Sequence, residues 1–359
     1  MQDLPIHLLV AIAGLAAGTA FGALAQRTGF CTMGAISDAV VMDDKRRLRA
    51  WIAAIGIAML GANALHAAGA IDLRGSIYLA PNLGWLGAIF GGALFGFGMV
   101  LAGGCGQRNL VRAGAGNLKS VVVLLILGIA AYATLRGIVG YARVNTWERL
   151  NLDLRALGFA DQSLPTLAGI DRPILAVLLG AALLIWCFKD KAFRASKRDV
   201  IAGLGVGALI VLGWAITGVL GRDDFDPTPL ASFTFVAPVG DTLFYAMFWT
   251  GTKINFGVST VFGMLIGSAI AAKASGEWRL ESFRDANDFL RNAGGAILMG
   301  IGGVSALGCT VGQGITGLST LAVGSFLAVA GIVFGAILAL KYLEEGSLGA
   351  AVKALFARG

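Results

Sequence analysis

Three of the four cysteines, Cys31, Cys105 and Cys309, lie in short glycine-containing segments where an apolar run ends and a more polar one begins. A thiol is a soft, polarisable group that donates and accepts hydrogen bonds weakly. It is a poor partner for the oxygens of sulfate and a better one for a ligand that itself exposes sulfur. These positions therefore favour contact with a sulfur-bearing anion.

The remaining cysteine, Cys187, lies inside an apolar run, and we expect it to behave as a small buried hydrophobe. The four cysteines form no CxxC pair and no zinc spacing, and His7 and His66 are the only histidines. We therefore expect no metal and no cofactor. A single histidine in an apolar run is usually a packing residue, so His66 is assigned no role.

The glycine-cysteine segments recur along the chain. Gly103–Arg108 (GGCGQR) is similar to Gly308–Gly314 (GCTVGQG), and each follows a glycine-rich apolar run. A second pair matches Arg27–Thr32 (RTGFCT) with Lys253–Val258 (KINFGV), where glycine replaces cysteine. Two motifs that each occur twice predict an internal duplication.

Basic residues flank these segments, and the start of a helix presents free N–H groups that attract anions. A charge inside a membrane segment suggests function, although the same side chain can also reach the interface and orient its helix. The predicted ligand-binding residues are Arg27, Cys31, Gly104, Cys105, Gly106, Gln107, Arg108, Lys253, Asn255, Gly308, Cys309 and Gln313.

The composition predicts an all-α polytopic membrane protein. Hydrophobic residues make up 57% of the 359 residues and charged residues 14%, with a mean hydropathy of +0.79, whereas soluble domains carry roughly 25% charge. Runs 84–103, 200–221 and 315–340 contain no charged residue and approach or exceed the ~20 residues that cross a membrane. We expect about nine long transmembrane helices plus short re-entrant helices at 30–42 and 105–117.

The first apolar run, Leu4–Ala25, has a small-residue site at Ala23–Ala25 that imitates a signal peptide. Its start contains Asp3 and no lysine or arginine, and its apolar stretch is too long for a signal sequence. We therefore expect residues 1–25 to stay in the mature protein.

Clusters of lysine and arginine place loops 43–49, 189–198 and 273–291 in the cytoplasm, and loops 70–83 and 221–241 outside. Cys105 then follows a run entering the cell and Cys309 a run leaving it, as inverted repeats require. The predicted organisation is a first repeat at 1–141, an external linker with a surface helix at 142–172, a connecting helix and loop at 173–198, and a second repeat at 199–359.

At these residues the chain resembles the YeeE/YedE family of bacterial inner-membrane sulfur transporters. The most specific matches are GFC at Gly29–Cys31, GGCGQR at Gly103–Arg108, NFG at Asn255–Gly257, and the run from WRLE at Trp278–Glu281 to GCT at Gly308–Thr310. The resemblance implies an hourglass-shaped helical transporter that imports thiosulfate through a narrow waist by S–H to sulfur hydrogen bonds. It implies Cys31, Cys105 and Cys309 as the donors, and a TusA-like sulfur-carrier protein as partner.

Three alternatives are open at this point. The substrate could be another sulfur or selenium anion, the protein could be a membrane thiol-disulfide oxidoreductase, or it could be a sulfate permease in which the cysteines are incidental. The absence of a CxxC pair weighs against the oxidoreductase, and a transporter that is not an enzyme is favoured. No basic segment is interleaved with aromatic residues in a soluble module, so we expect no nucleic acid.

Overall fold

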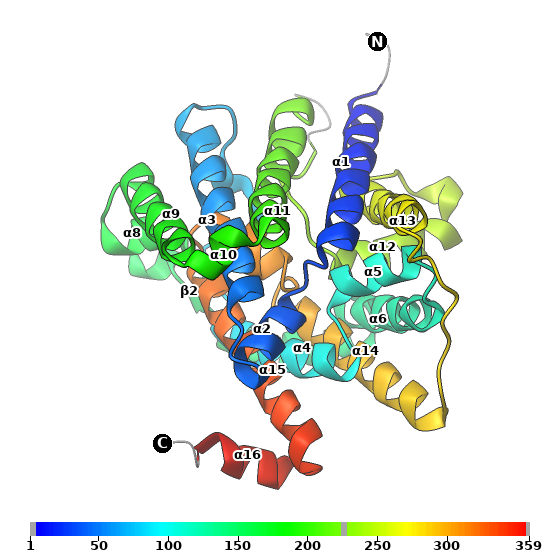
Figure 1. Cartoon of the computed structure of the whole chain (residues 1–359). Helices are drawn as coiled ribbons and strands as arrows, with labels where there is room; N and C mark the ends of the chain where they lie inside the picture. The colour runs from blue at the N-terminus through cyan, green and yellow to red at the C-terminus, as the bar shows by residue number, and fades with distance from the viewer. Residues whose placement is uncertain (1–4, 224–227, 357–359) are drawn as a thin grey trace.

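The computed structural model describes residues 5–223 and 228–356 and is almost entirely helical, as Figure 1 shows. Residues 1–4 of the predicted first repeat, 224–227 of the predicted outer loop 221–241, and 357–359 of the predicted second repeat lie outside the described residues. Apart from isolated bridges, the described residues form only two short strands, which pair antiparallel. The all-α prediction is confirmed.

The elements of the first half are α1 (Ile6–Thr28), α2 (Thr32–Val41), α3 (Arg46–Ala67), β1 (Asn82–Leu83), a π-helical turn Gly87–Gly91 leading into α4 (Gly92–Leu101), α5 (Gly106–Gly114), α6 (Leu118–Arg136), α7 (Ile138–Asn145), β2 (Leu152–Asp153) and α8 (Leu164–Ala168). The elements that follow are α9 (Arg172–Lys189), α10 (Lys191–Ala195), α11 (Lys197–Ala215) with a π-helical turn Ile216–Leu220, α12 (Val236–Met247), α13 (Phe256–Ala274), α14 (Ala286–Ser305), a π-helical segment Gly312–Gly317, α15 (Val323–Glu345) and α16 (Leu348–Phe356).

In the described ranges, eight helical runs are long and apolar enough to cross a membrane, one fewer than the nine expected. The ninth long helix is α14, whose first turns carry Asp288, Arg291 and Asn292. The outward faces of α6 and α9 bear exposed apolar side chains such as Ile129 and Ile185, as lipid contact requires. The chain is a polytopic membrane protein.

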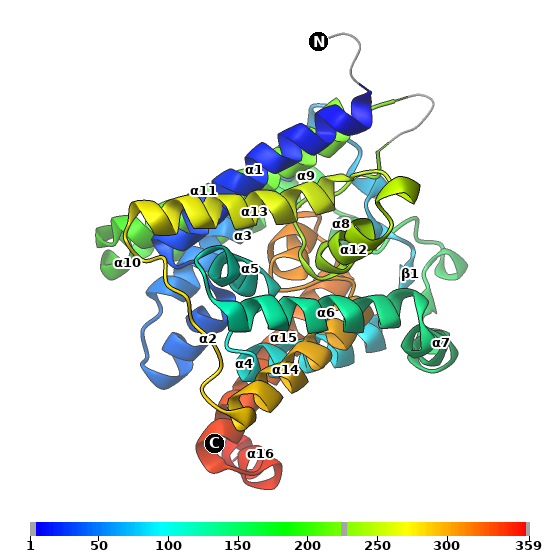
Figure 2. The same ribbon diagram turned by 90° about the vertical axis from the view of Figure 1, so that its right-hand side faces the viewer.

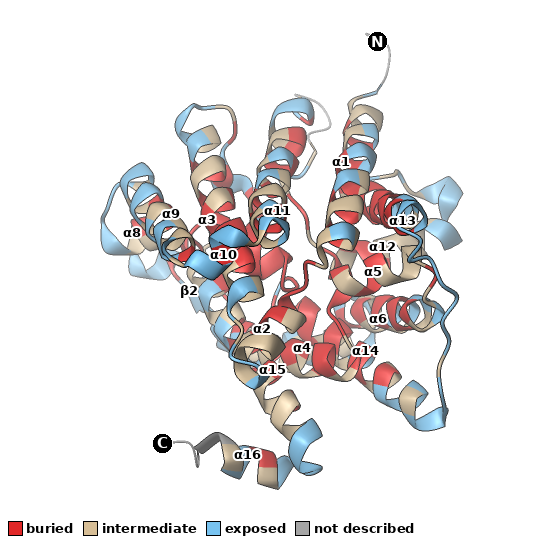
Figure 3. Cartoon of the chain, in the orientation of Figure 1, coloured by how far each residue is buried: buried red, intermediate tan, exposed pale blue. Residues whose placement is uncertain are grey.

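The expected re-entrant segments contain α2, of 10 residues, and α5, of 9 residues. At 1.5 Å per residue neither can cross the roughly 30 Å of hydrocarbon alone. Each follows a long helix after a short break, at Gly29–Cys31 and at Ala102–Cys105. Figure 3 shows that the buried residues concentrate in the middle of the molecule, where these breaks lie.

Helices of the two halves interdigitate. α1 packs along α13 and α3 along α11, while α4 packs along α15 and α6 along α14 (Figures 1 and 2). In the first turn of α11, Arg198 Nε donates to the Thr28 carbonyl oxygen at the end of α1 (2.7 Å), so α1 and α11 run in opposite directions. Gly91 and Gly98 face Gly302 and Gly295, so α4 and α14 also run oppositely. These are the relations that an inverted repeat requires.

The same packing favours one pairing that differs from the sequence prediction. The segment at Lys253–Val258 leads into α13, whose place in the packing matches that of α3, not of α2. The short helix that matches α2 is α12, and the residues before it include Phe233 and Thr234. The 46–67 helix α3 therefore has α13 as its counterpart, and Phe235 stands directly before α12 as Cys31 stands before α2.

The external linker folds as a cap rather than as one surface helix. It contains 3-10 turns at Trp147–Leu150 and Arg155–Leu157, strand β2, which pairs with β1, and α8. Hydrogen bonds fasten this cap to the start of α15, since the Gln162 Oε1 accepts from the Gly324 amide (3.1 Å).

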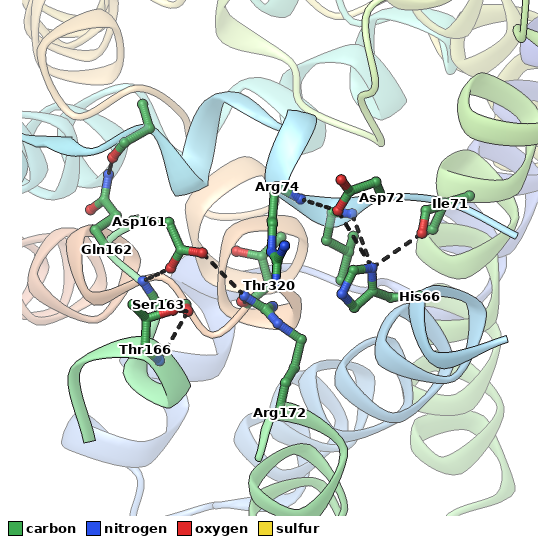
Figure 4. Close-up of polar contacts among 12 residues, drawn as sticks. His66, Ile71, Asp72, Arg74, Asp161, Gln162, Ser163, Thr166, Arg172 and Thr320 are labelled. Carbon is green, nitrogen blue, oxygen red and sulfur yellow. Dashed lines mark hydrogen bonds and ion pairs between the residues drawn. The ribbon is translucent and has the colours of Figure 1, made fainter. Parts of the chain in front are cut away.

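Figure 4 shows the charged contacts behind the cap. Arg172 donates to the Thr320 carbonyl oxygen (3.0 Å) and lies 3.9 Å from Asp161. Burial opposes ionisation of Asp161, but hydrogen bonds with Ser163 and Thr166 and the nearby arginine hold its pKa below the ordinary value. His66 contacts the Ile71 carbonyl oxygen (3.1 Å) at the end of α3, which is a packing role.

Glycine allows the helices to approach this closely. A Cβ atom at Gly267 on α13 would lie 1.9 Å from the Thr19 carbonyl oxygen on α1, and one at Gly335 on α15 would lie 2.0 Å from the Ala93 carbonyl oxygen on α4. Small residues at helix contacts are the usual solution in membranes, where the hydrophobic effect does not drive helices together. The 53 glycines are explained in large part by this packing.

We expect Gly267→Ala to lower the melting temperature in detergent by about 5 °C, because overpacking costs about 1–3 kcal/mol. The matched control is Gly294→Ala on α14, where an added Cβ would meet nothing within 4 Å. That change should be neutral or stabilising, since alanine is the better helix former. Equal melting temperatures for the two variants would contradict the packing.

Candidate functional site

Cys31, Cys105 and Cys309 occupy equivalent local positions. Each lies just before a helical segment, and at Cys31 and Cys309 the amide three residues further on points to the sulfur. The Gly34 amide lies 3.4 Å from Cys31 Sγ, and the Gly312 amide lies 3.4 Å from Cys309 Sγ. All three thiols are free and buried. Each sulfur is therefore held at the positive end of a helical segment.

The structure gathers these three cysteines from distant parts of the chain. Cys105 lies within electrostatic range of both Cys31 and Cys309. Arg108 interacts with Cys31 and Cys105, whereas Tyr78 interacts with Cys309. We call these three cysteines the cysteine row, with Arg108 near Cys31 and Cys105 at one end and Tyr78 near Cys309 at the other.

A cavity of about 550 Å³ opens at the Arg108 end of this row. Its wall includes Gly103, Arg108 and Arg112 from the first half and the 277–292 segment from the second. The acidic groups of this wall have partners: Glu277 accepts from Gln26 (2.9 Å), Glu281 from Asn117 (2.6 Å) and Asp288 from Lys119 (2.6 Å). By the loop charges this is the cytoplasmic side, and we call the space the inner cavity.

Arg108 contributes positive charge where the inner cavity meets the cysteines. In residues 5–223 and 228–356 its guanidinium has no ion pair and no side-chain hydrogen bond. Arg112, by contrast, donates to the Gly103 carbonyl oxygen (2.7 Å) and so braces the turn before Cys105. Gly103 in that turn has φ 67° and Gly104 has φ 159°, so the break depends on glycine.

A second cavity, of about 400 Å³, lies at the Tyr78 end of the row. Its wall includes Tyr78, Gln162, Leu307 and Gln313, together with Glu148, whose partner is Arg143. Burial raises the pKa of Tyr78, so its hydroxyl keeps its proton. Residues 77–82 and 148–162 of its wall belong to segments predicted to lie outside, and we call it the outer cavity.

Thr234 stands beside Tyr78 at the edge of the outer cavity. Its hydroxyl lies against the phenol of Tyr78, and a Cβ atom added at Gly312 would lie 2.4 Å from Thr234 Oγ1. Glycine at 312 therefore leaves room for Thr234 next to the Cys309 turn. Neither Tyr78 nor Thr234 was singled out from the sequence, since neither lies beside a cysteine in the chain.

The two glutamines of the repeated motif differ in their surroundings. Gln313 donates to the Ala306 carbonyl oxygen (2.5 Å) and accepts from the Ser325 hydroxyl (2.5 Å), so it ties the Cys309 turn to α15. Gln107 is equally buried, but its Nε2 has no hydrogen-bond partner. A Cβ added at Gly308 would lie 3.1 Å from the Gln313 amide, whereas one at Gly106 would meet nothing closer than 3.8 Å.

Arg27, Lys253 and Asn255 are not brought to the cysteines. Arg27 and Lys253 are exposed, and Arg27 lies at the C-terminal end of α1 beside an apolar-lined hollow. Asn255 caps α13 by accepting from the Val258 amide (2.8 Å). A ligand-binding role for these three residues stays a prediction from sequence.

Cys187 lies apart from the other cysteines and donates to the Arg49 carbonyl oxygen (3.3 Å), as a packing residue would. In the described part of the chain no group of three or more histidine, cysteine or acidic side chains is placed to hold a metal ion.

Comparison with known proteins gives one family and several relatives. A family model described as "Sulphur transport" matches residues 27–338. The chain is 28% identical over 324 residues to the thiosulfate transporter TsuA of Escherichia coli (strain K12), covering 85% of this chain and 86% of the relative. It is 27% identical over 329 residues to the thiosulfate transporter TsuA of Spirochaeta thermophila, covering 90% and 96%. A shorter match, 30% over 139 residues, covers 38% of this chain and 32% of the probable transporter YedE of Salmonella typhimurium.

The two glutamines offer a matched test of the site's construction. Gln313→Leu removes two buried hydrogen bonds and leaves their partners unpaired, so we expect a loss of about 2–4 kcal/mol in stability. Gln107→Leu removes an amide with an unpaired nitrogen and should change stability by less than about 1 kcal/mol. Thermal unfolding in detergent measures both, and a Gln107→Leu variant as unstable as Gln313→Leu would refute the distinction.

Proposed function

Because the chain belongs to the sulphur transport family, as its motifs indicated, we propose that it imports thiosulfate across a bacterial inner membrane. The family and the two long matches to thiosulfate transporters support sulfur transport in general. The observation that carries the choice of substrate is the row of three buried thiols between an outer and an inner cavity. A substrate with a terminal sulfur is the ligand for which such a row is suited.

The proposed route connects the outer cavity to the inner cavity through the three cysteines. Thiosulfate enters the outer cavity, passes Tyr78, and meets Cys309, Cys105 and Cys31 in turn. It leaves beside Arg108 into the inner cavity. The row of thiols forms the narrow waist, and at each position an S–H group donates to the terminal sulfur of the anion.

Two physical features make this route suitable for a dianion. The sulfurs lie at the starts of helical segments, whose free N–H groups attract negative charge without adding a full positive charge. Thiols are weak donors, so each contact is easily broken. Several weak positions in series allow an ion to leave, whereas one strong position would retain it.

At the inner side we propose that a TusA-like sulfur-carrier protein receives the anion. The resemblance to the YeeE/YedE family implies such a partner. The mixed charges around the inner cavity, contributed mainly by 277–292, offer polar groups at the place where a carrier would meet the released anion.

Growth on thiosulfate as sole sulfur source tests the proposal in a host lacking other uptake routes. We expect wild type to support growth, and Cys31→Ala, Cys105→Ala and Cys309→Ala each to abolish or reduce it at least about tenfold while inserting normally. Cys187→Ala is the matched control and should grow as wild type, because its thiol bonds only a backbone carbonyl.

Each alternative predicts a different result. Normal growth of all three alanine variants would remove the thiol row from the mechanism and favour an oxyanion permease. Failure of wild type would exclude thiosulfate as substrate. An essential disulfide between any two of these cysteines during turnover, trapped by alkylation in cells, would favour the oxidoreductase.

A further inference from the structure

Buried polar atoms without a partner gather beside the thiols. In the described residues, eight buried side-chain nitrogen or oxygen atoms have no hydrogen-bond partner. Three of them, Thr32 Oγ1, Gln107 Nε2 and Thr310 Oγ1, belong to residues one or two positions after a cysteine of the row. An unpaired buried donor costs free energy, so a cluster of them calls for a ligand to satisfy it.

The local backbone explains why the two hydroxyls are unpaired. A buried threonine in a helix normally donates to the carbonyl three or four residues earlier, as Thr134 does to Ala130 (2.7 Å). Thr310 lies in the turn between α14 and Gly312–Gly317, so no helical residue three or four positions earlier presents a carbonyl oxygen to it. Its hydroxyl is therefore left without a partner.

Thr32 is in the same situation in the first half. Thr32 is the first residue of α2, so the residues three and four positions earlier, Gly29 and Thr28, precede the break and are not in its helix. Their carbonyl oxygens accept from Arg47 (3.0 Å) and Arg198 (2.7 Å). Cys31-Thr32 and Cys309-Thr310 therefore share the same arrangement, in which the threonine hydroxyl after the cysteine has no partner.

Thr310 also connects neighbouring thiols. It follows Cys309 in the chain, and its side chain lies against the thiol of Cys105 without the geometry of a hydrogen bond. Its side chain is fully buried, so the hydroxyl does not face solvent. Cys105 is followed by Gly106, which has no side chain, and the facing Thr310 supplies a hydroxyl there.

We propose that the hydroxyls of Thr310 and Thr32 donate hydrogen bonds to the oxygen atoms of the anion while the thiols contact its terminal sulfur. This inference rests on the proposed function. A charged oxygen accepts a stronger hydrogen bond from a hydroxyl than a neutral group does, and thiosulfate carries both kinds of atom. Each Cys-Thr pair then recognises the sulfur and the sulfonate end together, and an anion that lacks oxygen is bound less well.

The decisive variants are Thr310→Val and Thr32→Val, which keep the shape of the side chain and remove the hydroxyl, with Thr310→Ser and Thr32→Ser as variants that retain it. Concentration-dependent thiosulfate uptake and thermal unfolding are measured on each purified, reconstituted protein. We expect the valine variants to raise the KM for thiosulfate about tenfold and the serine variants to stay within about twofold of wild type.

Thermal unfolding separates binding from structure. The hydroxyls are unpaired in the free protein, so valine should leave the melting temperature unchanged or raise it. Thr134→Val, which removes a buried hydroxyl that bonds its own helix, is the control and should leave uptake unchanged.

Two results would overturn the inference while leaving thiosulfate transport intact. One is wild-type uptake by the valine variants alongside loss of uptake in Cys309→Ala. The other is a lower melting temperature in the valine variants with no rescue by serine, which would give the hydroxyls a structural role. Absence of thiosulfate uptake by wild type would instead overturn the proposed function, and this inference with it.

Discussion

The structure depends on one constraint, which is that a broken helix inside a membrane must be enclosed by protein. The chain breaks before α2, before α5 and before Gly312–Gly317, and each break exposes backbone N–H and C=O groups that lipid cannot satisfy. Long helices from both halves surround all three breaks, and glycine lets them pack without gaps. Since the breaks hold Cys31, Cys105 and Cys309, the enclosure that stabilises the backbone also buries the thiols.

The local pattern of residues in the sequence predicted most of the fold and the three cysteines at the centre of the site. Apolar run lengths predicted the spanning helices, and the repeated glycine-cysteine motif identified the three thiols that the structure gathers. Arg27 and Lys253 were selected because they flank a break in sequence, but the direction of a side chain around a helix end depends on tertiary packing. Tyr78 and Thr234 reach the row from segments with no motif, so only the fold reveals them.

The two copies of the repeated motif also differ in what their glutamine side chains do. Gln107 and Gln313 are identical in type and nearly identical in context, yet one is unpaired and the other braces its turn. The sequence could not distinguish them, because the difference lies in Ser325 and the Ala306 carbonyl, which are supplied by packing. Likewise Phe235 stands directly before α12 where Cys31 stands before α2, so the symmetry concerns the backbone more than the chemistry.

The interdigitation of the halves has a consequence for biosynthesis. α1, α3, α4 and α6 each pack mainly on a helix that the ribosome makes much later, at 197–345. During translation each of these first helices stands in lipid with its glycine-lined groove empty until its own partner is inserted, and the last of these partners to be inserted is α15, on which α4 packs. Assembly therefore depends on contacts between segments far apart in the sequence that form late.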